Sequence, residues 1–289
     1  MTSQQGLLLR IANITINLTA DSPEMNLKVG GDIEKFLTEE READVRVRAS
    51  WGDLSKRICE KKLFDSGVLW QLYCDNESYL FRFALSPSDS LPYKTASFNH
   101  EFTTGEVILH PSYFDQNQHV YPLEYPLDEL LITNFLAKGR GVEVHALGVV
   151  ASGGDGYLFV GQSGAGKSTM ARLWHRREGV KVLSDDRIIL RKENKKIWLY
   201  GTPWHGEAGL ATPHRAPLTA LYFLRHGQEN ELVALKGTQA VGRLFASSFV
   251  PFYSPGGLKF TLQFLDEVVE AVPCYELRFM PDERVIELW

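Results

Sequence analysis

Residues 161–169 read Gly161-Gln162-Ser163-Gly164-Ala165-Gly166-Lys167-Ser168-Thr169 and fill every position of the phosphate-binding consensus G-x-x-x-x-G-K-[ST]. The apolar run 157–160 before them predicts a short buried strand, and residues 168–177 predict a helix that Gly179 closes. A strand, a glycine loop and a helix in this order are the context that the motif requires. Glycine lets backbone N–H groups turn towards an anion, and the helix N-terminus adds partial positive charge. The sequence therefore predicts a nucleoside triphosphate site.

The motif also assigns roles to its side chains. Lys167 is expected to reach the β- and γ-phosphates, and the Ser168 hydroxyl is expected to bind Mg²⁺. ATP and Mg²⁺ are therefore the expected cofactors. The expected nucleotide-binding residues are Gly161, Ser163, Gly164, Ala165, Gly166, Lys167, Ser168 and Thr169.

Composition excludes several other classes of protein. The chain has 289 residues, and 31 basic against 36 acidic side chains give a net charge of −5. Because the basic residues are scattered, neither nucleic acid nor an anionic membrane is expected as the main partner. The cysteines Cys59, Cys74 and Cys274 are widely spaced without a C-x-x-C pair, which is typical of reduced thiols. The first residues, Met1–Gln5, lack a basic start and a long apolar run, so we expect a cytoplasmic protein. The oligomeric state, including a homo-oligomer, stays open.

The chain is expected to divide into a β-rich N-terminal lobe, residues 1–120, and a catalytic domain, residues 121–289. Turn residues at Asp75-Asn76 and 86–88 separate strand-like runs in the first part, which lie at 7–18, 45–49, 68–72, 79–84 and 104–109. The lobe contains no chemical motif. Pro126 can open a helix that Leu127, Leu131 and Phe135 continue and that Gly139 ends. The fold class is mixed α/β and rich in strands.

A histidine is expected next to the glycine loop. Residues 142–151 predict a strand, and the turn at 153–156 predicts an antiparallel hairpin with the strand that enters the loop. Reflection about residue 154 places His145 opposite about residue 163. A histidine on a strand is more often a core or surface residue, but this position makes a functional role equally reasonable.

Two adjacent acids follow the strand after the loop helix. Residues 180–184 predict an apolar strand, and Asp185-Asp186 end it, where they would lie beside bound phosphates. One acid could hold the metal and the other could accept the proton of an attacking hydroxyl. Neighbouring side chains of a strand point to opposite faces, so we expect the two acids to have different roles. The plainer alternative is a turn into the next strand.

A second hairpin is expected to bring a polar loop to the acids. Residues 187–191 and 197–201 flank the turn 192–196, and reflection about residue 194 places Thr202 opposite Asp186. Glu207 is then a candidate second metal ligand, His205 a candidate substrate contact, and Arg215 a candidate brace for phosphate oxygens. His205 and Glu207 could equally be loop surface, and for Arg215 a surface position is the commoner outcome. Further strands are expected at 219–224, 231–235 and 273–279, and helices at 238–249 and 258–272.

The order of these motifs over residues 140–205 resembles the catalytic domain of HPr kinase/phosphorylase, which belongs to the fold group of phosphoenolpyruvate carboxykinase. The motifs are His145, the glycine loop, a short helix, Leu183-Ser184-Asp185-Asp186 and a hairpin. The resemblance implies that Asp185 takes the proton from an acceptor serine and that His145 supports it. It also implies that Asp186 binds the metal, with Glu207 a looser match.

The later segments 200–207 and 272–278 look more like HPr-kinase-like proteins that phosphorylate peptides. The segment after the second hairpin lacks the phosphorolysis signature of the founding enzymes, and the N-terminal lobe differs from theirs. The first difference argues against a reverse, phosphorylase activity, and the second argues against HPr itself as the substrate.

The expected function is an ATP-dependent kinase that acts on a hydroxyl, with the serine of a protein or peptide as acceptor. Asp185, Lys167 and His145 are the expected catalytic residues, and Ser168, Asp186 and Glu207 the expected metal ligands. Two alternatives stay open. One is a small-molecule kinase, although those chains usually begin with the phosphate loop. The other is a nucleotide-binding regulator that retains the loop without transferring phosphate.

Overall fold

The computed structural model describes residues 6–54, 61–74, 78–86, 91–115 and 118–289. Residues 1–5, Cys59, the Asp75-Asn76 turn and residues 87–88 lie outside this part. The chain forms two compact units that divide between Phe135 and Leu136. The division lies later than the predicted boundary at residue 120, because the helix that follows Pro126 groups with the first unit. No described helix combines the length and the apolar character that a membrane span needs.

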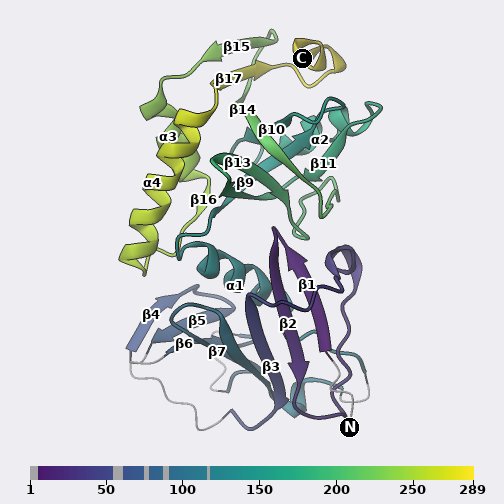
Figure 1. The fold of residues 1–289 in the computed structure, drawn as a ribbon, viewed down its shortest axis with the longest axis vertical. Helices are drawn as coiled ribbons and strands as arrows, with labels where there is room; N and C mark the ends of the chain where they lie inside the picture. The colour runs from purple at the N-terminus through teal and green to yellow at the C-terminus, as the bar shows by residue number, and fades with distance from the viewer. Residues whose placement is uncertain (1–5, 55–60, 75–77, 87–90, 116–117) are drawn as a thin grey trace. The chain divides into compact units, whose positions relative to one another are not determined.

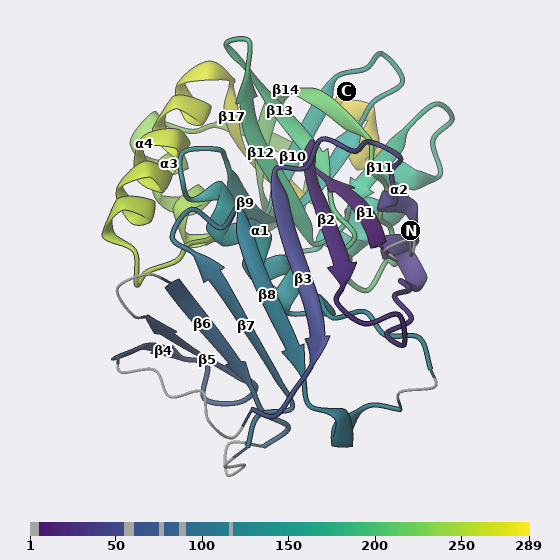
Figure 2. The same cartoon turned by 60° about the horizontal axis from the view of Figure 1, so that its bottom comes forward.

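The first unit contains, among its described residues, an eight-stranded mixed sheet in the order β1-β2-β3-β8-β7-β6-β5-β4 (Figure 2). The β2–β3 and β3–β8 pairs are parallel and the others are antiparallel. Its elements are β1 (Gly6–Ile11), β2 (Ile14–Ala20), η1 (Gly31–Phe36), β3 (Val45–Trp51), β4 (Lys61–Asp65), β5 (Trp70–Cys74), β6 (Ser78–Phe83), β7 (Lys94–Asn99), β8 (Thr104–Leu109), η2 (Pro111–Tyr113) and α1 (Leu127–Leu136).

The N-terminal run that the sequence predicts as a single strand is a hairpin. Ala12 and Asn13 both adopt positive φ, 52° and 59°, and reverse the chain between β1 and β2. Such a two-residue turn matches the twist of an antiparallel pair, and asparagine tolerates it well. The prediction also missed β4 and β7, because their many polar residues interrupt the alternation of apolar and polar side chains that marks a strand.

The second unit forms a second mixed sheet with helices on both faces (Figure 1). Its elements are β9 (Val142–Val150), β10 (Gly156–Val160), α2 (Lys167–His175), β11 (Lys181–Ser184), β12 (Arg187–Glu193), β13 (Lys196–Gly201), β14 (Arg215–His226), β15 (Glu231–Ala234), α3 (Gly237–Ala246), β16 (Ser248–Phe249), α4 (Pro255–Ala271), β17 (Cys274–Phe279) and η3 (Glu283–Leu288).

Strand β9 is the centre of this sheet. It pairs with β10, β11, β12 and β16, all antiparallel. Its Val144 and Ala146 pack into one core with α3 and α4, while Leu147 and Val149 pack into the other core with α2. A strand that is buried on both faces reads as a continuous apolar run, which explains the sequence of residues 142–150.

Strand β14 connects the remaining parts of the sheet. It is parallel to β10, with Val160 opposite Phe223, and parallel to β17. It is antiparallel to β13, so the pairings β9–β12–β13–β14–β10 form a closed circuit. The sequence predicts strands near β14 and β15 joined by a polar turn, but β15 pairs with β17 instead.

Candidate active site

The predicted glycine loop, residues 161–166, lies between β10 and α2. Gly164 and Gly166 adopt positive φ, 81° and 99°, which residues with a Cβ rarely adopt. A Cβ on Gly166 would also lie 2.6 Å from Cζ of Phe279. The first hydrogen bond of α2 runs from Met170 N to Gly166 O (2.9 Å), and the amides before it point out of the helix N-terminus. Two glycines with positive φ directly before a helix N-terminus are features that an anion-binding loop needs.

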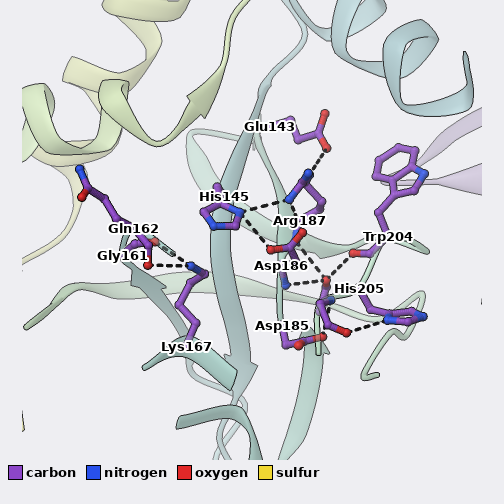
Figure 3. Close-up of polar contacts among 12 residues, drawn as sticks. Glu143, His145, Gly161, Gln162, Lys167, Asp185, Asp186, Arg187, Trp204 and His205 are labelled. Atoms are coloured by element: carbon purple, nitrogen blue, oxygen red, sulfur yellow. Dashed lines mark hydrogen bonds and ion pairs between the residues drawn. The ribbon is translucent and has the colours of Figure 1, made fainter. Parts of the chain in front are cut away.

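Lys167 is the first residue of α2, and its side chain reaches back to Gly161 and Gln162 at the start of the loop (Figure 3). Its ammonium donates hydrogen bonds to Gly161 O (2.7 Å) and Gln162 O (3.3 Å), and the residue is 7% exposed. Burial lowers the pKa of Lys167, and the carboxylate of Asp186 opposes this shift more than that of Asp185 does. Lys167 and the two acids therefore share one electrostatic environment.

Asp185 and Asp186 lie in a short break between two strands that run along the same edge of β9. Val182 of β11 lies opposite Val149, and Arg187 of β12 lies opposite His145. Within the break, Ala146 N donates to Asp186 O (3.1 Å). The sequence predicts that the acids end a strand, but the chain continues in the same direction past them. The break turns their side chains away from the regular ladder.

Asp185 anchors the loop that follows the second hairpin. Its Oδ1 accepts from Gly206 N (3.0 Å) and Leu210 N (3.3 Å), and its Oδ2 accepts from Ala208 N (2.8 Å). The residue is 1% exposed. A Cβ on Gly206 would lie 2.9 Å from Oδ2, so this close approach needs glycine. The loop after the second hairpin therefore lies next to the acids, as expected, and Asp185 holds it there through these three hydrogen bonds.

Asp186 has different surroundings. Its Oδ1 lies 3.0 Å from Nδ1 of His145, and its Oδ2 accepts a hydrogen bond from Arg187 (Figure 3). The side chain is 23% exposed. Burial alone would raise the pKa of Asp186, but the hydrogen bond with His145 and the charges of Arg187 and Lys167 outweigh it and lower the pKa. Of the two acids, Asp186 is the more accessible carboxylate.

His145 lies beside the glycine loop, as the sequence predicts, although the register differs. The pairing of Val160 with Ala146 places Gly161 opposite His145, two residues before the expected position. Nδ1 of His145 also lies 3.1 Å from Nη1 of Arg187. The histidine therefore belongs to a polar network with Asp186 and Arg187.

Arg187 joins this network to the interior of the unit. Its guanidinium lies 4.3 Å from the ring centroid of Phe249, and its Nε lies 4.0 Å from Oε1 of the buried Glu143. The second hairpin is shifted by one residue from the prediction, so Thr202 lies beside Arg187 rather than Asp186, and its Oγ1 donates to Arg187 O (2.7 Å).

Four other predicted residues lie at different places in the unit. His205 and Glu207 are exposed on the loop after the second hairpin, and no described group of three His, Cys, Asp or Glu side chains converges as metal ligands. Ser168 is half-buried at the N-terminus of α2. Arg215 begins β14, at the end opposite the glycine loop, where it contacts Glu193 (2.7 Å) and Tyr200 (2.8 Å). The structure thus separates Arg215 from the candidate site, because β14 runs parallel to β10.

Sequence reasoning missed several residues of the site. Arg187 directly follows the acids, and Glu143 shares a strand face with His145, so both had a signal in the sequence. Phe249 and His226 had none, because they reach the site through β16 and the carboxyl end of β14. Nε2 of His226 lies 2.8 Å from Gly164 O and fixes the loop there.

Comparisons with known proteins identify no family. No family model matches the chain, and no curated protein matches it. One similar solved structure is the Hpr(Ser) kinase/phosphatase from Coxiella burnetii, with 14% identity and a TM-score of 0.30. The match covers 50% of this chain and 88% of that chain. Such values indicate a weak structural resemblance and do not make the chain a member of that family.

Proposed function

We propose that this protein is an ATP- and Mg²⁺-dependent kinase that transfers the γ-phosphoryl group to a hydroxyl, with the serine of a protein or peptide as acceptor. The observation that carries the proposal is the arrangement of Lys167, at the end of a glycine loop with features of an anion-binding loop, beside the His145–Asp186–Arg187 network. Phosphoryl transfer needs positioning, positive charge and a proton acceptor, and this arrangement offers groups for each.

The proposed step is a direct displacement. The acceptor oxygen bonds to the γ-phosphorus, the bond from that phosphorus to the β-phosphate oxygen breaks, and ADP leaves. The proton of the hydroxyl passes to a carboxylate of the Asp185–Asp186 pair. The resemblance to HPr kinase/phosphorylase gives this role to Asp185, whereas the more exposed oxygens of Asp186 favour Asp186.

Oxygen ligands for a metal are also available. Mg²⁺ prefers carboxylate, hydroxyl and phosphate oxygens, so Ser168 would hold it together with the acid of the Asp185–Asp186 pair that does not take the proton. When bound, it would neutralise charge that develops on the phosphates. The exposed position of Glu207 gives no support for its part in this set.

The test uses γ-labelled ATP. Wild-type protein, Mg²⁺ and host lysate should yield labelled acceptors in which mass spectrometry finds phosphoserine. Lys167→Ala should abolish labelling and weaken ATP binding by at least about tenfold, because the ammonium is a charged phosphate contact. Lys259→Ala, at an exposed lysine of α4, is the matched control. ATP binding without transfer would favour the regulator, and labelling of metabolites alone would favour a small-molecule kinase.

A further inference from the structure

A pocket of about 460 Å³ opens beside the glycine loop. Residues 161–165 form one wall, and the carboxyl ends of β10 and β14 form the floor. Ligands of α/β proteins bind outside the carboxyl ends of parallel strands, which is the position of this pocket. Arg225 and Arg243 supply its positive charge, while Phe223 and Ala246 supply apolar surface.

A buried carboxylate holds the two arginines in place. Glu276 of β17 is 4% exposed, and its Oε2 lies 2.8 Å from Nη1 of Arg243. Its Oε1 lies 3.5 Å from Nη1 of Arg225 and 3.0 Å from Nε of Arg278. Three guanidinium groups therefore share one carboxylate, and among the residues that the structure describes only Arg278 has a further acidic contact, Glu231 (3.1 Å). Positive charge remains on the pocket side.

The two pocket arginines remain accessible. Arg225 and Arg243 side chains are 64% and 45% exposed, and each guanidinium has five N–H donors. Each uses one nitrogen on Glu276, so further donors are available to a ligand. Arginine forks match carboxylate and phosphate groups, and a fork already fixed by a partner loses little freedom on binding. The pair therefore has the chemistry of an anion receptor.

The pocket is linked to the acidic network through the backbone of β9. Ser247 lines the pocket, and Ser247 O accepts a hydrogen bond from His145 N (2.7 Å). The side chain of His145 in turn contacts Asp186. In the proposed transfer, the acceptor must reach the γ-phosphate from the side of that network, whereas the nucleoside lies at the opposite end of the triphosphate.

We propose that Arg225 and Arg243 form a subsite for a carboxylate of the acceptor, so that the preferred substrate is a serine peptide with an acidic side chain near the serine. The inference rests on the proposed kinase function. The subsite explains why a buried glutamate organises arginines at the edge of a nucleotide loop. It is a specificity device, separate from the groups that carry the transfer.

The experiment uses serine peptides that differ only in Glu or Gln at one position near the serine. Two quantities are measured for each peptide, namely the Kd by fluorescence anisotropy and kcat/KM with ATP and Mg²⁺. We expect the wild type to prefer at least one Glu peptide by about tenfold, as one charge-assisted contact predicts. The double variant Arg225→Gln/Arg243→Gln should lose this preference and keep its ATP Kd. Arg284→Gln, at an arginine outside the pocket, should change neither.

The outcomes separate the subsite from the function. Charge-dependent peptide binding without transfer would keep the subsite and remove the kinase. Transfer with equal rates for all Glu and Gln pairs, or no binding of any peptide, would overturn the subsite. If the double variant binds ATP more weakly and still prefers the Glu peptides, the arginines contact the nucleotide instead. That result would also overturn the subsite. If the double variant fails to fold, the wild type is measured at increasing salt concentration instead. Its preference for Glu over Gln peptides should decrease as salt screens the arginines, and a preference that does not change with salt would refute the subsite.

Discussion

Replacing Asp185 and Asp186 by asparagine, one at a time, tests whether Asp185 mainly holds the structure and Asp186 mainly serves the reaction. Asp185 accepts three backbone N–H bonds at 3.0, 2.8 and 3.3 Å and is 1% exposed. Asparagine keeps a single oxygen, so it can retain the two bonds on Oδ1 but presents an NH₂ group to the N–H of Ala208. One charge-assisted bond is lost, and the partly buried amide of Ala208 loses its acceptor.

The magnitude follows from these contacts. A hydrogen bond to a charged group contributes about 1.5–3 kcal/mol, and an unsatisfied buried group costs about 1–3 kcal/mol. Asp185→Asn should therefore lower the free energy of unfolding by about 2.5–6 kcal/mol. At about 2–4 °C for each kcal/mol, the Tm of the second unit should fall by roughly 5–24 °C. Asp186→Asn, at a partly exposed ion pair, should change the free energy of unfolding by less than about 1 kcal/mol.

The assay combines thermal unfolding with phosphoryl transfer at a temperature where all variants are folded. Asp266→Asn, an exposed aspartate of α4, is the control for the substitution itself. We expect Asp186→Asn to remain stable and to lose transfer. Asp185→Asn with an unchanged Tm and no transfer would refute the anchor role and support Asp185 as the base that the sequence predicts.

Two further perturbations test the loop and the arginine cluster. Gly166→Ala combines a φ of 99° with a contact of 2.6 Å to Phe279, so it should cost at least about 1–2 kcal/mol and weaken ATP binding in a titration, whereas Gly256→Ala, with open space around it, should not. Burial would raise the pKa of Glu276, but hydrogen bonds from Arg243 and Arg278 outweigh it and lower the pKa. The stabilisation by this carboxylate is then present above about pH 4.5 and lost as pH falls through the lowered pKa. Chemical unfolding of wild type and Glu276→Gln should therefore differ constantly from pH 8 to pH 5 and converge below about pH 4; a gap that already narrows above pH 5 would contradict this linkage.

Local signals predicted much of the second unit. The apolar strand before the glycine loop and the helix after it follow from periodicity and glycine placement, and so do the two C-terminal helices. The turn at Asn194-Lys195, with φ of 50° and 65°, closes the second hairpin near the predicted centre. These features depend on residues close in sequence, which is why their positions are correct to within a few residues.

The pairing of strands that are far apart in the chain could not be predicted from the sequence. Nothing local shows that β11 and β12 continue along one edge of β9, or that β14 runs parallel to β10. The first arrangement changes the surroundings of Asp185, and the second separates Arg215 from the loop and brings His226 to it. The roles of the acids stay predictions, but their different burial is visible only after the strands are assembled.

The position of β9 has a consequence for how this unit tolerates change. The glycine loop, the aspartate pair and Ser247 each follow or precede a strand that is hydrogen-bonded to β9, so a single backbone sets the spacing among all three. Insertions in the connecting segments could lengthen the chain without altering that spacing. A proline within β9 would remove ladder bonds to its neighbours and misalign every catalytic candidate at once.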